Sequence, residues 1–301
     1  MSPPRSPATT GKTLQHRADQ VAAAFPPLLI AAERVAATVA QGVHGRRRVG
    51  PGETFWQFRR FQSGDQIRAI DWRRSARSTH YFIRDTEWEA AESVWLWRDG
   101  SPSMDYRSDG AEQTKGERAT LILLAVAALL VRASEQFAML GDDSRPRTGP
   151  AALSRLAVQL LRPQAGSPAA LGLPRVEPLP RFSQALLVGD FLSPLAELDA
   201  IVRGYSARAV KGHIVQILDP AEAAMPFLGR TRFEGMEGEG DFLTGRAEAL
   251  AGDYRDRLAR HEEGLRTIAR NYGWSYVRHV TDRPPESLLL ALYCAMAEQW
   301  D

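Results

Sequence analysis

Three oxygen-bearing side chains at alternate positions, Asp99, Ser101 and Ser103, are the best candidates for chemistry in this chain of 301 residues. They follow the apolar run VWLW and lie where the chain turns, at Gly100 and Pro102. On a tight loop after a strand, alternate side chains turn toward one point, so that a carboxylate and two hydroxyl oxygens face a single hard cation. The spacing therefore predicts a site for Mg²⁺ or Mn²⁺.

A second aspartate, Asp190, ends the run ALLVGD, and we expect it to complete the site. Open parallel sheets bind ligands outside the carboxyl ends of their strands, which is where both aspartates are predicted to lie. Two alternatives stay open. An aspartate followed by serines also makes ordinary turns and helix caps. In addition, the guanidinium of Arg98 could pair with the carboxylates and replace the metal.

The elements that must position these residues alternate between strands and helices. Apolar runs predict strands over residues 93–97, 136–140, 185–188, 213–218 and 274–280. Helical periodicity predicts helices over residues 116–133, 151–161, 194–205, within 243–269 and over 285–299. This alternation is typical of an α/β fold with a mainly parallel sheet and helices on both faces. A small hairpin is expected within residues 225–243, with Gly238 and Gly240 at its turn.

The first third of the chain lacks this regular alternation of strands and helices. Residues 1–20 are rich in Pro, Ser and Thr, which indicates a disordered tail. Residues 25–41 have a helical apolar pattern, and residues 45–92 are rich in arginine and aromatic residues, with a short strand at 81–84 but no simple period elsewhere. We expect residues 21–92, the helix and this segment together, to pack on a core domain formed by residues 93–301.

Two motifs resemble those of known families. The sequence DGSPSM after a strand resembles the metal-ion-dependent adhesion motif of von Willebrand factor A-type domains. The sequence FRRFQSGDQIRAIDWRRSAR closely resembles the signature of the family called domain of unknown function 58. The residues that carry this second resemblance, and for which a structural role is expected, are Arg60, Gly64, Asp65, Arg68, Asp71, Trp72 and Arg77.

The resemblance implies a von Willebrand A-like, Rossmann-like sheet with an N-terminal extension. It also implies a partner, a MoxR-type AAA+ ATPase. With that partner the protein would act as a non-catalytic, metal-dependent adaptor in the chaperone-like maturation of client proteins. The sequence departs from the full adhesion motif at one point. The motif also takes a threonine from another loop, and neither Thr148 nor Ser167 has the flanking residues that this role needs.

Catalysis and nucleic-acid binding find less support. The sequence has no Gly-x-Ser-x-Gly elbow and no Walker A loop, and none of its six histidines lies in a recognised catalytic context. We therefore expect a protein that is not an enzyme, with a metal-dependent hydrolase as the alternative. Nucleic-acid binding through Arg46, Arg47 and Arg48 is a weaker alternative, because a solvated turn explains these three residues as well.

Composition sets the remaining expectations. The single cysteine, Cys294, excludes an intramolecular disulfide and a cysteine-rich zinc site. No run reaches the roughly 18 apolar residues of a membrane helix, and the N-terminus does not resemble a signal peptide. The net charge is only +2, so charge alone does not imply a nucleic-acid partner. A cytoplasmic protein without a membrane span is expected.

Overall fold

The chain forms two compact units in its computed structural model. Met1–His44 together with Glu92–Asp301 form the larger unit, and Gly45–Ala91 form the smaller one. The residues that the structure describes are 30, 32–39, 55–60, 72–78, 80–86, 93–142, 145–162, 172–238 and 240–298. The tail predicted over residues 1–20 and the basic run Arg46–Arg48 lie outside them.

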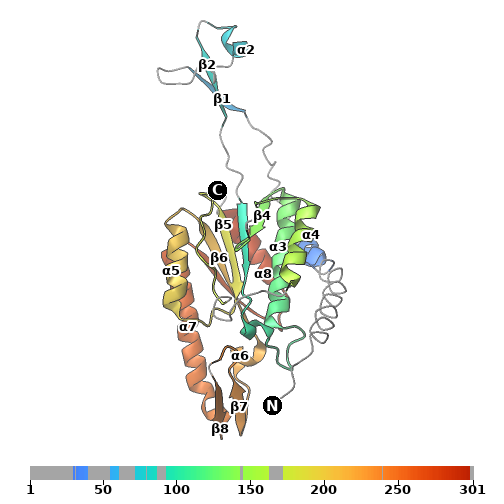
Figure 1. The fold of residues 1–301 in the computed structure, drawn as a ribbon, viewed down its shortest axis with the longest axis vertical. Coiled ribbons are helices and arrows are strands. Elements are labelled where there is room, and N and C mark those ends of the chain that lie inside the picture. Colours follow the sequence, from blue (N-terminus) through green and yellow to red (C-terminus); the bar gives the residue numbers. More distant parts are fainter. Residues whose placement is uncertain are drawn as a thin grey trace, which may run out of the picture. The chain divides into compact units, whose positions relative to one another are not determined.

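A five-stranded parallel sheet forms the centre of the larger unit (Figure 1). Its strands, in the order β4-β3-β5-β6-β9, are Gln136–Met139, Ser93–Arg98, Gln184–Gly189, Lys211–Leu218 and Ser275–Val280. All four neighbouring pairs are parallel. The chain runs from β3 outward to β4 and then returns past β3 to β5, so the strand order reverses between β3 and β5. Such a switch point is where open α/β sheets bind ligands.

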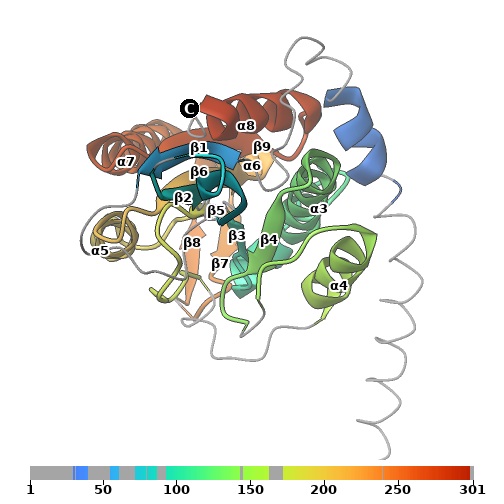
Figure 2. The ribbon, with the colours of Figure 1, turned by 90° about the horizontal axis from the view of Figure 1, so that it is seen from above.

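Helices cover both faces of the sheet, which confirms the predicted fold class (Figure 2). One apolar core contains the helical residues 32–39 and the helices α3 (Lys115–Ala133), α4 (Pro150–Leu161) and α8 (Glu286–Glu298). The other core contains α5 (Leu195–Ser206) and α7 (Ala251–Asn271). Because successive strand side chains point to opposite faces, Leu186 enters the first core and Leu187 the second.

A hairpin is present where the sequence predicts one. It follows the short helix α6 (Pro220–Ala224) and consists of β7 (Thr231–Glu234) and β8 (Asp241–Thr244). Gly238 and Gly240 have φ angles of 97° and 86°, a left-handed conformation that glycine adopts without strain. A 3₁₀ turn, η4 (Ala247–Ala249), then leads into α7.

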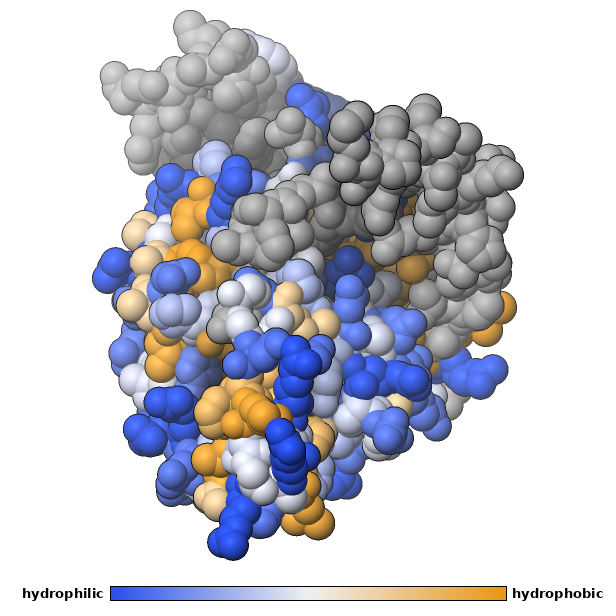
Figure 3. All heavy atoms as spheres, turned by 60° about the horizontal axis from the view of Figure 1, so that its bottom comes forward, coloured by the Kyte–Doolittle hydropathy of each residue, from blue (hydrophilic) through white to orange (hydrophobic). Residues whose placement is uncertain are grey.

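Exposed apolar side chains lie on and beside this hairpin: Leu228, Met236, Phe242 and Leu243. Figure 3 looks at the end of the molecule from which the hairpin extends, and apolar patches stand there among polar side chains. Patches of this kind are frequent at protein interaction sites. Within the part of the chain that the structure describes, no helix is both long and apolar enough to cross a membrane.

The smaller unit contains an antiparallel strand pair and one turn of helix. The strands are β1 (Phe55–Arg60) and β2 (Phe82–Thr86), and the turn of helix is α2 (Trp72–Ser75). Four of the family-signature residues, Gly64, Asp65, Arg68 and Asp71, lie outside the described residues, and Arg60 pairs with Phe82 in the strand ladder. Trp72 and Arg77 are exposed, and the Trp72 ring meets the Tyr81 ring edge-on at 6.0 Å between centroids.

Candidate metal and partner-binding site

Two neighbouring strand ends bring the predicted ligands together. Asp99 follows β3 and Asp190 follows β5, and the Asp99 N–H donates to the Val188 carbonyl at 2.9 Å. The close approach depends on Gly189. A Cβ at that position would lie 2.8 Å from the Asp99 Cβ and 2.9 Å from Asp99 Oδ2. Glycine at 189 therefore makes room for the Asp99 carboxylate.

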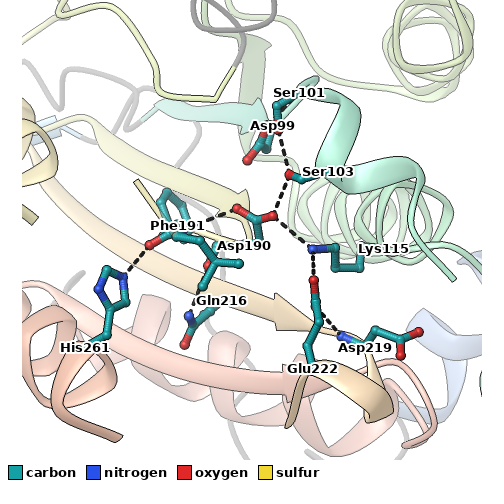
Figure 4. A network of polar contacts seen from close by, with 11 residues as sticks. Asp99, Ser101, Ser103, Lys115, Asp190, Phe191, Gln216, Asp219, Glu222 and His261 are labelled. Carbon is teal, nitrogen blue, oxygen red and sulfur yellow. Dashed lines mark hydrogen bonds and ion pairs between the residues drawn. The ribbon is translucent and has the colours of Figure 1, made fainter. Parts of the chain in front are cut away.

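All four predicted ligands belong to one hydrogen-bonded network (Figure 4). Asp99 Oδ1 accepts from the Ser101 N–H at 2.8 Å and from the Ser101 hydroxyl at 2.6 Å. The Ser103 hydroxyl donates to Asp190 Oδ2 at 2.6 Å. The two serine oxygens lie 3.0 Å apart. The 3₁₀ turn η2 (Pro102–Asp105) holds this loop in place through Met104, which is 2% exposed.

The network is short of protons. Ser101 and Ser103 each have one hydroxyl proton, and these two protons serve three close contacts between oxygens. In addition, Asp99 Oδ2 is buried and has no hydrogen-bond donor. With both hydroxyls donating to the aspartates, no hydrogen therefore lies between the two serine oxygens. Such a cluster is completed by an added proton or by a hard cation.

The environment of Asp99 favours its neutral form. Burial raises the pKa of Asp99 to about 7, the negative charge of Asp190 adds to this effect, and the hydrogen bonds from Ser101 oppose it. Asp99 is 1% exposed, so water cannot stabilise its charge. A proton and a metal ion would therefore compete for the same carboxylate.

A buried lysine that the sequence analysis missed lies beside the predicted ligands. Lys115, the first residue of α3, is 0% exposed, and its ammonium contacts Asp190 Oδ2 at 2.9 Å and Glu222 Oε1 at 2.6 Å. Burial lowers the pKa of Lys115, but Asp190 and Glu222 raise it by more, so it ends above its ordinary value. A signal was present in the sequence, since a lysine in the first turn of a helix opposes the helix dipole and therefore needs acids nearby.

The structure corrects the alternative that Arg98 pairs with the carboxylates. Arg98 Nη1 donates to Thr120 Oγ1 of α3 at 2.7 Å, and no ion pair joins it to Asp99 or Asp190. The reason is the alternation of side chains along a strand, which turns Arg98 and Asp99 to opposite sides. The cation that enters the network is Lys115.

Surrounding bonds hold the acids in place. Glu222 and Asp219 form a capping box at the start of α6, in which the Asp219 carboxylate accepts from Ala221 N and the Glu222 carboxylate accepts from Asp219 N. Gln216 donates to the Asp190 carbonyl at 3.0 Å. The end of β6 therefore fixes both acids that contact Lys115.

The donor set fits a hard cation, with one ligand of the adhesion motif missing. Carboxylate and hydroxyl oxygens suit Mg²⁺ or Mn²⁺, and Asp99 Oδ2 is free to bind. Among the described residues, no cluster of three or more His, Cys, Asp or Glu side chains could hold a metal, so the serines would have to contribute. Thr148 does not replace the missing threonine, because Arg147 pairs with Phe137 and this places Thr148 beside the amino half of β4. Ser167 lies outside the described residues.

Sequence comparison identifies the family. The pattern described as "Protein of unknown function DUF58" matches residues 57–264. The chain belongs to this family. The match confirms the resemblance seen in the segment FRRFQSGDQIRAIDWRRSAR. The uncharacterized proteins Rv1480 of Mycobacterium tuberculosis (strain ATCC 25618 / H37Rv) and Mb1516 of Mycobacterium bovis are each 25% identical to this DUF58 member, over 94% of this chain and 93% of theirs.

Solved structures resemble the DUF58 chain in part. One is an aerotolerance-related membrane protein from Bacteroides fragilis, with 16% identity over 69% of this chain and 99% of that one, and a TM-score of 0.41. Another is the conserved hypothetical protein BatB from Bacteroides thetaiotaomicron, with 16% identity over 69% of this chain and 98% of that one, and a TM-score of 0.35.

Proposed function

We propose that this protein is a non-catalytic adaptor that binds protein partners through a divalent cation held by Asp99, Ser101, Ser103 and Asp190. The observation that carries the proposal is the buried Asp99 Oδ2, which has no hydrogen-bond donor, on a carboxylate that bonds Ser101 at the switch point of the sheet. Bound Mg²⁺ or Mn²⁺ would supply a positive charge with open coordination positions. Asp99 would hold this ion, and Asp190 would orient Ser103 toward it.

The partner class in this proposal comes from the family resemblance. A von Willebrand A-like domain of this family implies a MoxR-type AAA+ ATPase as partner, and chaperone-like maturation of client proteins as the shared task. The exposed apolar side chains at the hairpin, among them Leu228 and Phe242, support a protein rather than a small molecule as the ligand. The hairpin follows α6, whose Glu222 belongs to the same polar network as the ligands.

The alternative of a metal-dependent hydrolase has no such support. A metal-dependent hydrolase needs enough carboxylate or histidine ligands to activate a water, and among the described residues no cluster of three or more His, Cys, Asp or Glu side chains could hold a metal. A nucleophilic serine would need a base within hydrogen-bond reach. Among the described residues, no histidine hydrogen-bonds to Ser101 or Ser103, and His261, the histidine labelled in Figure 4, bonds the Phe191 carbonyl at 2.6 Å. Both serine hydroxyls donate to aspartates of the network.

Loss of the Asp99 charge tests the proposal. We expect Asp99→Asn to abolish Mg²⁺-dependent capture of a MoxR-type AAA+ ATPase, because the amide removes the negative charge that holds the ion. Capture by the unaltered protein should be lost in EDTA. Biolayer interferometry with the immobilised ATPase, in Mg²⁺ and in EDTA, measures both effects.

Asp105→Asn is the matched control. Asp105 is an exposed acid on the same loop, outside the oxygen cluster, and its removal should leave capture unchanged. Circular dichroism establishes that each variant is folded. The proposal is wrong if capture by the folded Asp99→Asn protein, and by the unaltered protein in EDTA, equals that of the unaltered protein in Mg²⁺.

A further inference from the structure

We propose that Lys115 weakens the divalent-cation affinity of the site by neutralising Asp190, so that occupancy follows the free Mg²⁺ concentration. This inference rests on the proposed function, because it concerns the same ligands. The Lys115 ammonium is fully buried and bridges Asp190, which follows β5, and Glu222, which lies in α6 after the neighbouring strand β6 (Figure 4). The site therefore contains a fixed positive charge before any metal ion arrives.

The bonds of Asp190 show why this charge matters. Asp190 Oδ2 accepts from Ser103 Oγ at 2.6 Å and from Lys115 Nζ at 2.9 Å, and Oδ1 accepts from Leu192 N at 3.3 Å. A cation that bound Asp190 through Oδ2 would have to compete with the two donors that this oxygen already has. Asp99 Oδ2, in contrast, has none. A divalent ion would thus meet one carboxylate oxygen without a donor, Asp99 Oδ2, and a second carboxylate, Asp190, that an ammonium already contacts.

Electrostatics gives the direction of the effect. The ammonium repels a divalent ion directly, and it also cancels much of the attraction that Asp190 would exert. In a buried site this repulsion is screened much less than at the surface. Removing the ammonium should therefore tighten binding by about tenfold or more. Weak binding in its presence makes partner capture responsive to changes in free Mg²⁺.

The test compares two variants that differ only at Lys115. Glu222→Gln removes one of the two acids that contact the ammonium, and Lys115→Met/Glu222→Gln then removes the ammonium without leaving Glu222 buried and unpaired. Isothermal titration calorimetry with MnCl₂ measures the Kd of each. We expect the Kd of the double variant to be about tenfold lower than that of Glu222→Gln. A damaged fold would not produce such a gain of affinity.

Lys211→Met is the matched control. Lys211 is exposed at the amino end of β6, whereas the site lies at the carboxyl ends of the strands. Its removal therefore changes the net charge of the protein without changing the contacts of the site. Its Mn²⁺ affinity should equal that of the unaltered protein. Thermal melts in EDTA report stability in the absence of the ion.

The inference is overturned if the double variant binds Mn²⁺ no more tightly than Glu222→Gln, or if neither binds it. The proposed function fails on a different result, partner capture that is indifferent to EDTA and to Asp99→Asn. The two failures are therefore distinguishable, because one is read from Mn²⁺ affinity and the other from partner capture.

Discussion

His213 links the stability of the fold to pH at the scale of a single residue. It is 0% exposed in β6, and its ring nitrogens lie 2.7 Å from Ser275 Oγ and 3.2 Å from Gln184 Oε1. Burial lowers the pKa of His213 from the ordinary 6.5 to about 4. The folded protein therefore keeps this ring neutral at pH values at which the unfolded chain protonates it.

We expect the free energy of unfolding to fall as the pH drops from about 6.5 toward 4, because the unfolded state binds the proton first. The loss from this one group amounts to about 3 kcal/mol. Urea unfolding at a series of pH values measures it. His213→Gln should remove about this much of the loss between pH 6.5 and 4, and His80→Gln, at an exposed histidine, should not. An unchanged pH dependence in His213→Gln would count against a buried neutral ring.

Residue by residue, the sequence predicted which oxygen-bearing side chains lie together better than it predicted the charge around them. Asp99 and Asp190 were found because each follows an apolar run, and parallel strands end at the same edge of a sheet. Lys115 contacts Asp190 across 75 residues of sequence, and no local pattern specifies that contact. From its place in the sequence, Arg98 was the cation expected beside the carboxylates. Successive side chains of a strand point to opposite sides, and Arg98 bonds Thr120 instead.

At the scale of elements, the start of α3 positions Lys115. Thr114 Oγ1 accepts from Glu117 N at 3.1 Å, and the Glu117 carboxylate accepts from Thr114 N at 2.9 Å, which forms a capping box. These bonds satisfy backbone donors that the helix leaves free. The cap fixes the first turn, and therefore also fixes the backbone from which the Lys115 side chain extends.

Thr114→Ala should lower the free energy of unfolding by about 1 kcal/mol, because the helix loses its capping acceptor. Thr267→Ala is the matched control. Thr267 is exposed in the last third of α7, where alanine is at least as good a helix former. Chemical denaturation of both variants gives the comparison, and equal losses would show that the cap contributes nothing of its own.

Elements whose apolar residues form a clear run or periodic pattern could be predicted from the sequence, and elements without such a pattern could not. Strands β3, β5, β6 and β9 lie within a few residues of their predicted bounds. The first three are mostly buried, and buried parallel strands are rich in apolar residues. The sequence of strand β1 (Phe55–Arg60) has no hydrophobic periodicity that would predict a strand there. Helix α6 (Pro220–Ala224) is too short for periodicity, although Asp219, Pro220 and Glu222 have the spacing of a capping box.

At the scale of the whole molecule, the sheet separates two apolar cores. The sequence predicted helices on both faces, since strands that are apolar throughout require cover on each side. It did not predict which helices share a face. Helices α3 and α8 lie far apart in the sequence, yet Leu124 and Leu289 belong to the same core. Which helices pack against one another depends on the crossover connections and on tertiary packing, and no local sequence pattern specifies these.

Two adjacent leucines of β5 test this two-sided architecture. Leu186 and Leu187 are both 0% exposed, but they enter different cores. We expect Leu186→Ala and Leu187→Ala each to lower the free energy of unfolding by about 2–5 kcal/mol, because each leaves a cavity that close-packed neighbours cannot fill. Leu192→Ala, at a side chain that is 44% exposed, should cost far less. Urea denaturation measures all three. A small loss at only one of the two buried leucines would mean that its face of the sheet is not packed, and that the helices assigned to that face do not cover it.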